Sequence, residues 1–334
     1  MKPWLLVIPV LVAAAFFLRP SSPTATSGKL FPDFRPDDVR SIQISATKNH
    51  VTLIRRSEGW TVLERDNFPA DPARITQLLR QMWDLAPTQE IPARPPQLDR
   101  FQLLDEQTGA PPNHQAMEVS FLDQNKKSFA VLLLGKLQTQ EGKEGMPGMV
   151  SGRFVRPSGH EGSVYLTKEL FHEVLPSPMA WLDKRFPAIA QPRAFEYRSH
   201  GDHWKVVLED GQWKLDDTKN NEAMDPNTLY SLLTQWAAPS FFDVAPSPDN
   251  HDFTPEAQLT IHDAKGESVT YDIGVPGRAA YPVKVRGASH LTSNHWKDRI
   301  FLVEAPLVDA IPKTRAEMTM PPHPPQETKP PASL

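Results

Sequence analysis

The chain has 334 residues and contains no cysteine. Its 36 Lys and Arg residues against 40 Asp and Glu residues give a formal net charge of −4 at pH 7. Without cysteine it has no disulfide, thiolate nucleophile, Cys-ligated zinc or iron–sulfur cluster. The lack of a basic excess argues against a nucleic-acid partner. Prolines number 35, roughly twice average usage, and 39% apolar residues suffice for about two domains with cores of their own.

The N-terminal residues 1–19 predict a membrane anchor. Met1-Lys2-Pro3 precedes an uncharged apolar run from Trp4 to Leu18, the pattern of an export signal. Arg19-Pro20 interrupts the place where small residues would form a cleavage site, so an uncleaved anchor is favoured over a cleaved signal peptide. Because basic ends stay cytoplasmic, the bulk of the chain is expected to be extracytoplasmic.

Two further segments are expected to lack a folded core. Residues 20–35 form a linker between the anchor and the first folded module. Residues 313–334 form a proline-rich disordered tail, since six prolines follow Met320 with almost no apolar side chain.

Two helices are predicted at equivalent places in an internal repeat. Asp71-Pro72 and Asp225-Pro226 each start one, because Asp accepts from free backbone N–H groups and Pro has no N–H to leave unsatisfied. An apolar stripe spaced i, i+3, i+4, i+7 follows each start. The second stripe lies 154 residues after the first (229 − 75). The stripes are Ile75, Leu78, Leu79 and Met82, and Leu229, Leu232, Leu233 and Trp236.

Strand patterns repeat on both sides of these helices. Ser57 to Val62 and Glu209 to Leu215 each predict a glycine-containing turn and a strand opened by a tryptophan. Met117 to Gly135 and Ala257 to Gly274 each predict two strands joined by a polar turn. Trp60 and Trp213 are expected to pack in the core. The repeat signature comprises Trp60, Asp71, Pro72, Leu78, Leu79, Gly135, Trp213, Asp225, Pro226, Leu232, Leu233 and Gly274.

The repeats predict an α+β fold of two tandem, internally duplicated modules, each a mostly antiparallel sheet with a helix packed on one face. We expect the first module at 36–186, a joint at 187–192 and the second module at 193–312. A pair of related modules can form a groove where they meet, which suits a ligand or partner. The glycine-rich stretch from Glu141 to Arg153 is an insertion in the first module, interpreted either as a mobile loop or as one that a partner orders.

The sequence offers one weak metal candidate and no catalytic motif. His200, Asp202 and His203 lie close together, but zinc usually takes three or four rigidly held ligands, and a solvated hairpin turn is favoured. No GxSxG, HExxH or phosphate-loop pattern is present. We therefore expect no metal, no cofactor, no catalytic residue and no enzymatic activity.

A series of motifs carries a resemblance to a known family. The motifs are Ile42-Gln43-Ile44, Val51 to Arg55, Gly59 to Val62, Pro69 to Pro72, Leu132 to Gly135 and Val164 to Leu166. With the N-terminal apolar segment, they resemble the bacterial domain of unknown function 4340 family over most of residues 36–312. That family has no established activity and is similar to proteins encoded beside ABC-type transporter permeases and to gliding-motility-type auxiliary proteins. The resemblance implies an accessory component of the bacterial cell envelope, anchored in the inner membrane with its bulk in the periplasm.

We therefore expect a membrane-anchored accessory or scaffold protein that binds a partner protein, in particular an ABC-transporter-like envelope complex, without catalysis. The alternative is an envelope glycan-binding module or a polysaccharide hydrolase acting at the groove between the repeats. For that alternative, Trp181 and Trp296 are candidate sugar-stacking side chains, although core packing is the more economical interpretation of a large apolar residue.

Overall fold

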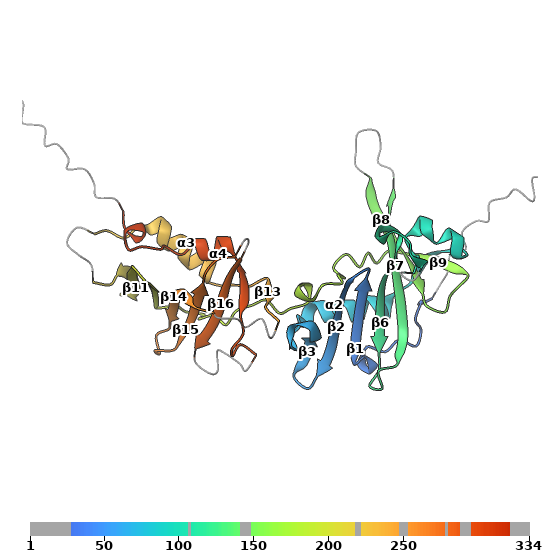
Figure 1. Ribbon diagram of the computed structural model, residues 1–334, viewed down its shortest axis with the longest axis horizontal. Coiled ribbons are helices and arrows are strands. Elements are labelled where there is room, and N and C mark those ends of the chain that lie inside the picture. The colour runs from blue at the N-terminus through green and yellow to red at the C-terminus, as the bar shows by residue number, and fades with distance from the viewer. Residues whose placement is uncertain are drawn as a thin grey trace, which may run out of the picture. The chain divides into compact units, whose positions relative to one another are not determined.

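The computed structural model describes residues 28–105, 108–140, 148–217, 222–246, 253–277, 280–287 and 295–320. The expected anchor at 1–19, most of the expected linker and residues 321–334 of the expected tail lie outside these ranges. The first part of that tail is folded instead, because Ala316–Met318 form a 3₁₀ turn that buries Met318 completely. In the expected linker, Phe34 is 3% exposed and packs against Phe121. Within the described ranges, no helix combines the length and apolar character needed to cross a membrane. The described residues form two compact units, one within residues 28–55 and 73–176 and the other within residues 56–72 and 177–320 (Figure 1).

The first unit contains a long antiparallel sheet. Alternating side chains of its central strands, such as Ile42, Ile44 and Phe121, are fully buried on one face, as the period of two in a half-buried strand requires. In register, Ile42 lies opposite Leu53 on one side and Phe121 on the other. In spatial order the strands of this sheet that lie mainly in the first unit are β2 (Asn49–Arg56), β1 (Ser41–Ala46), β6 (Met117–Leu122), β7 (Ser128–Gln140), β8 (Met149–Pro157), β9 (Ser163–Thr167) and β5 (Pro87–Pro92).

The second unit repeats this strand order. Its strands match those of the first sheet one for one, from β11 as the counterpart of β2 to β13 as the counterpart of β5, so the internal duplication extends to topology. In spatial order they are β12 (Gln212–Leu215), β11 (His203–Glu209), β10 (Ala194–Ser199), β14 (Pro255–His262), β15 (Ser268–Gly274), β16 (Ala280–Gly287), β17 (Phe301–Glu304) and β13 (Asp243–Val244).

The two predicted helices are present and bury equivalent residues. Helix α2 (Pro72–Asp84) buries Ile75, Leu78 and Met82, and α3 (Pro226–Trp236) buries Leu229, Leu232 and Trp236. The remaining stripe residues, Leu79 and Leu233, are half-buried.

The predicted cap of α3 is confirmed. The Asp225 carboxylate accepts from the backbone N–H of Asn227 at 2.9 Å and from the Thr228 hydroxyl at 3.0 Å. Pro226 occupies the first helical position, where its missing N–H costs no hydrogen bond.

The predicted fold class is only partly right. Both units are mostly antiparallel sheet, and the described ranges contain only one further α-helix, the short α4 (Ala305–Asp309). The chain is therefore richer in β-structure than the expected α+β fold. Apart from these helices, several connections between strands contain only short 3₁₀ turns, such as Pro95–Gln97 and Asp99–Phe101.

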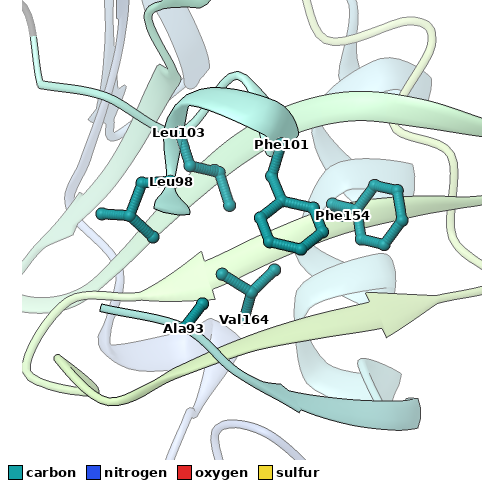
Figure 2. Close-up of a cluster of buried hydrophobic side chains, with 6 residues drawn as sticks. All are labelled: Ala93, Leu98, Phe101, Leu103, Phe154 and Val164. Atoms are coloured by element: carbon teal, nitrogen blue, oxygen red, sulfur yellow. The ribbon is translucent and has the colours of Figure 1, made fainter. Parts of the chain in front are cut away.

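Gly135 and Gly274, the two glycines of the repeat signature, occupy positions where a side chain would clash with a neighbouring segment. A Cβ atom on Gly135 would lie 2.4 Å from the carbonyl oxygen of Phe101, and one on Gly274 would lie 2.9 Å from the ring of Phe253. Each glycine therefore leaves room for a phenylalanine-bearing segment that crosses the sheet closely. In the first unit, Phe101 then packs against Phe154 with ring centroids 4.8 Å apart (Figure 2). The buried cluster around this pair also contains Ala93, Leu98, Leu103 and Val164.

The segment Arg56–Pro72 belongs by sequence to the first repeat but packs in the second unit. It contains strands β3 (Gly59–Val62) and β4 (Phe68–Pro69), joined through a 3₁₀ turn at Leu63–Arg65. Two backbone bonds link its end to the second unit: the N–H of Asp183 donates to Pro69 O at 3.0 Å, and the N–H of Asp71 donates to Trp181 O at 2.8 Å. The compact units therefore differ from the expected division at 36–186 and 193–312.

An aromatic cluster explains why this segment packs there. The Phe68 side chain is 1% exposed, and its ring meets those of Phe241, Trp296 and Phe301 nearly edge-on, with centroids 5.6, 5.6 and 5.8 Å away. Edge-to-face contacts at this distance add to the gain from burying apolar surface. Phe68 thus completes the core of the second unit.

An ion pair fixes the same segment in one orientation. The Arg65 Nε and a terminal guanidinium nitrogen each donate to one carboxylate oxygen of Asp243 at 2.7 Å. This two-point hydrogen bonding raises the pKa of Arg65. Because Asp243 is buried in β13, loss of Arg65 would leave a charge without its partner in the core.

We predict that Phe68→Ala destabilises the second unit by about 3–5 kcal/mol, because it removes a fully buried ring and leaves a cavity. Chemical denaturation followed by tryptophan fluorescence measures this change. Leu63→Ala is the matched control, since Leu63 lies in the same segment with a 44% exposed side chain and should change stability by less than about 0.5 kcal/mol. Equal effects of the two variants would contradict the packing role of Phe68.

Candidate functional site

A pocket of about 320 Å³ lies where the segment Arg56–Pro72 meets the second repeat, inside the second unit. We call it the Trp60 pocket. Its volume falls at the lower end of the range typical of small-molecule sites. The lining residues are Arg56, Ser57, Glu58, Gly59, Trp60, Thr61, Asp66, Asn67, Pro69, His295 and Arg299.

The polar side chains of the Trp60 pocket are held by one another. A terminal nitrogen of Arg56 donates to Asn67 Oδ1 at 3.0 Å, and His295 Nε2 lies 3.5 Å from Glu58 Oε2. The Arg56–Asn67 bond orients two planar hydrogen-bonding groups at the pocket before any ligand arrives, whereas Glu58, with an 80% exposed side chain, stays accessible beside His295.

Arg299 is the most constrained side chain of the pocket. Its guanidinium donates to the backbone carbonyl oxygens of Arg65 and Asp66 at 3.2 and 2.8 Å. It also lies 3.5 Å from Asp66 Oδ2 and 5.7 Å from the centre of the Phe68 ring. The same guanidinium therefore supports the Phe68 segment and lines the pocket.

The burial of the tryptophans decides between their two interpretations. Trp181 is 1% exposed, so the favoured core-packing interpretation is confirmed for it and the sugar-stacking alternative is wrong. Trp296 is half-buried and belongs to the Phe68 cluster. Trp60 and Trp213, expected in the core, are both half-buried. Sequence reasoning missed Trp60 as a pocket residue, although the polar residues Ser57 and Glu58 beside it were a signal.

The weak metal candidate forms a turn. His203 Nε2 lies 3.1 Å from Glu196 Oε1, and the Asp202 carboxylate accepts from the backbone N–H groups of His203 and Arg315 at 2.8 and 3.0 Å. His200 is exposed on the same turn. No group of three or more His, Asp or Glu suited to a metal ion occurs among the residues that the structure describes.

The first unit contributes a second candidate surface, formed by the C-terminal end of β7 and the N-terminal end of β8. Strand β7 pairs with β6 only as far as Leu134 and then continues to Gln140. Strand β8 pairs with β9 from Arg153 onward. We call residues 136–140 and 148–152 the β7–β8 arm, because Figure 1 shows these strand ends projecting beyond the rest of the sheet.

The arm is specific to the first repeat. In the second repeat, β15 ends at Gly274, the counterpart of Gly135, whereas β7 extends beyond Gly135. The described part of the arm includes the end of the glycine-rich stretch singled out in the sequence, while residues 141–147 lie outside the described ranges.

A charged cluster surrounds Glu196 on the outer face of β10. Arg198 Nε donates to Glu196 Oε1 at 2.6 Å, His203 contacts the same oxygen, and His262 Nε2 lies 3.7 Å from the other. Lys205 lines the adjoining groove of about 500 Å³. Burial alone would raise the pKa of Glu196, but the bonds from Arg198 and His203 outweigh it, so this pKa is lowered.

We predict that Glu196 contributes stability that is present above its ordinary pKa and is lost as the pH falls through its lowered folded-state pKa. The difference in unfolding free energy between wild type and Glu196→Gln should therefore shrink between about pH 6 and pH 3. Denaturation series at several pH values measure it. Glu209→Gln, in an exposed pair with Lys214, should show a small difference throughout. A Glu196→Gln difference that stays constant over this range would contradict the assignment.

Comparison with known proteins gives one family match. A family model described as Domain of unknown function (DUF4340) matches residues 60–260, which is more than half of the 334 residues. The matched range starts at Trp60 and ends within β14, so it includes parts of both repeats. No curated protein and no solved structure gives a match. The chain therefore belongs to the DUF4340 family, whose members share a domain of unknown function.

Proposed function

We propose that this chain is a membrane-anchored, extracytoplasmic accessory protein that binds a partner protein through the β7–β8 arm. The partner is an integral membrane protein of a transporter-like envelope complex, and binding involves no catalysis. The location in the inner membrane and periplasm rests on the N-terminal apolar segment and on the family resemblance. The arm carries the binding part of the proposal.

Exposed apolar side chains on the arm support this role. Met149 is 76% exposed, Val150 45% and Leu137 41%. Val150 lies opposite Thr139 in the β7–β8 register, and alternation along β7 places Leu137 on the same face as Thr139. Leu137 and Val150 therefore share one face of the arm. Isolated exposed apolar residues are normal, but a group of them on a projecting ribbon favours a contact surface.

The backbone of the arm offers a second kind of contact. Beyond Leu134, β7 pairs with β8 alone, and before Arg153, β8 pairs with β7 alone. Each strand of the arm thus has an outer edge without a neighbouring strand in the described part of the chain. An extended segment of a partner can add to such an edge through backbone hydrogen bonds, with side-chain pockets setting specificity. We infer that the partner supplies such a segment, with apolar side chains facing Leu137 and Val150.

The absence of cysteine from the natural sequence makes this proposal directly testable. A Val150→Cys variant of the full chain, labelled with a photo-crosslinker in native membranes, should form an adduct with an integral membrane protein. Val275→Cys is the matched control, because Val275 is also an exposed valine, at 59% against 45% for Val150, and lies in the second unit. It should form no such adduct.

Adding Leu137→Ser to Val150→Cys should lower the yield of the adduct at least tenfold, since loss of a central apolar contact commonly costs 1–2 kcal/mol or more in binding. The melting temperature should stay within a few degrees of wild type, because Leu137 is exposed. Equal adducts from positions 150 and 275, or an adduct insensitive to Leu137→Ser, would contradict the proposal.

A further inference from the structure

We propose that the Trp60 pocket binds a short, neutral saccharide by stacking a sugar ring on Trp60 and hydrogen-bonding its hydroxyl groups to the surrounding side chains. This inference is independent of the β7–β8 arm, which lies in the other unit. It is carried by the aromatic wall of the pocket, by its oriented polar groups and by its balanced charge.

The aromatic wall is the first argument. Trp60 is half-buried and lines the pocket, so its indole combines an apolar surface with a polar N–H at a site open to a ligand. Trp213 holds the same place in the second repeat, where its ring packs against Phe195 with centroids 5.8 Å apart. The duplication has therefore produced two tryptophans at equivalent positions, and one of them lines this pocket.

The oriented polar groups are the second argument. Sugar hydroxyls both donate and accept, so they match a ring of side chains that offers both functions. The pocket supplies donors from Arg56 and Arg299, acceptors from Glu58 and Asn67, and a histidine that can serve as either. The bonds of Arg56 to Asn67 and of Arg299 to backbone carbonyls fix two of these groups in advance. Such preorganisation lowers the entropy lost on binding.

The charge of the pocket distinguishes the class of ligand. Arg56 and Arg299 are balanced by Glu58 and Asp66, and Arg299 and Asp66 already form an ion pair. An anionic ligand such as a phosphate would need cations in excess, and a cationic ligand would need carboxylates in excess. A neutral polar molecule with an apolar face meets both the charge balance and the aromatic wall. The volume of about 320 Å³ suits a short saccharide better than a long chain.

Isothermal titration calorimetry and saturation-transfer NMR on the full chain test this inference. The probes are the neutral disaccharides cellobiose and N,N′-diacetylchitobiose, with inorganic phosphate as the charged comparator. We expect saturable binding of at least one disaccharide and no competition from phosphate. Trp60→Ala should weaken binding at least tenfold, Trp60→Phe should retain most of it, and Trp213→Ala should leave it unchanged.

A second variant separates loss of binding from loss of folding. Glu58 has an 80% exposed side chain, so Glu58→Ala should keep the melting transition of wild type while it weakens disaccharide binding several-fold. The inference is overturned if neither disaccharide binds, if Trp213→Ala weakens binding as much as Trp60→Ala, if Glu58→Ala leaves the affinity unchanged, or if phosphate displaces the sugar.

Discussion

The packing of Phe68 into the aromatic core of the second unit is the contact on which the rest of the structure depends. It places a segment of the first repeat in the second unit, where the Arg65–Asp243 pair then fixes its orientation. The Trp60 pocket exists only because of this placement, since its lining comes from residues 56–69 and from His295 and Arg299. A boundary drawn from the sequence repeats therefore does not coincide with the boundary of the compact units.

Local patterns predicted the elements of this fold better than their assembly. The stripes of α2 and α3 and the cap at Asp225 follow from short-range spacing, and they are present. The compact unit in which residues 56–72 pack depends instead on contacts between Phe68 and aromatic residues far away in the chain, such as Phe241 and Phe301. The hairpins around Trp60 and Trp213 look alike in sequence, so their pattern contains no information about the compact unit in which each one packs.

Duplication supplies the scaffold, and departures from it supply the candidate binding surfaces. The two sheets share one strand order, and Gly135 and Gly274 make room for equivalent phenylalanines. The arm arises because β7 continues past Gly135 while β15 ends at Gly274. The Trp60 pocket arises because the segment Arg56–Pro72 of the first repeat packs in the second unit, close to His295 and Arg299. Both asymmetries suit recognition of other molecules, which the proposed accessory role requires.

Native-state hydrogen exchange on the full chain tests the central claim most directly. The amide of Asp71, bonded to Trp181 O, and that of Ala70, bonded to Trp60 O, report on the segment. In Phe301→Ala, which weakens the core of the second unit, these amides should lose protection together with the second sheet. In Leu132→Ala, which removes a fully buried side chain of the first sheet, they should keep it. Loss of their protection in Leu132→Ala but not in Phe301→Ala would contradict the account.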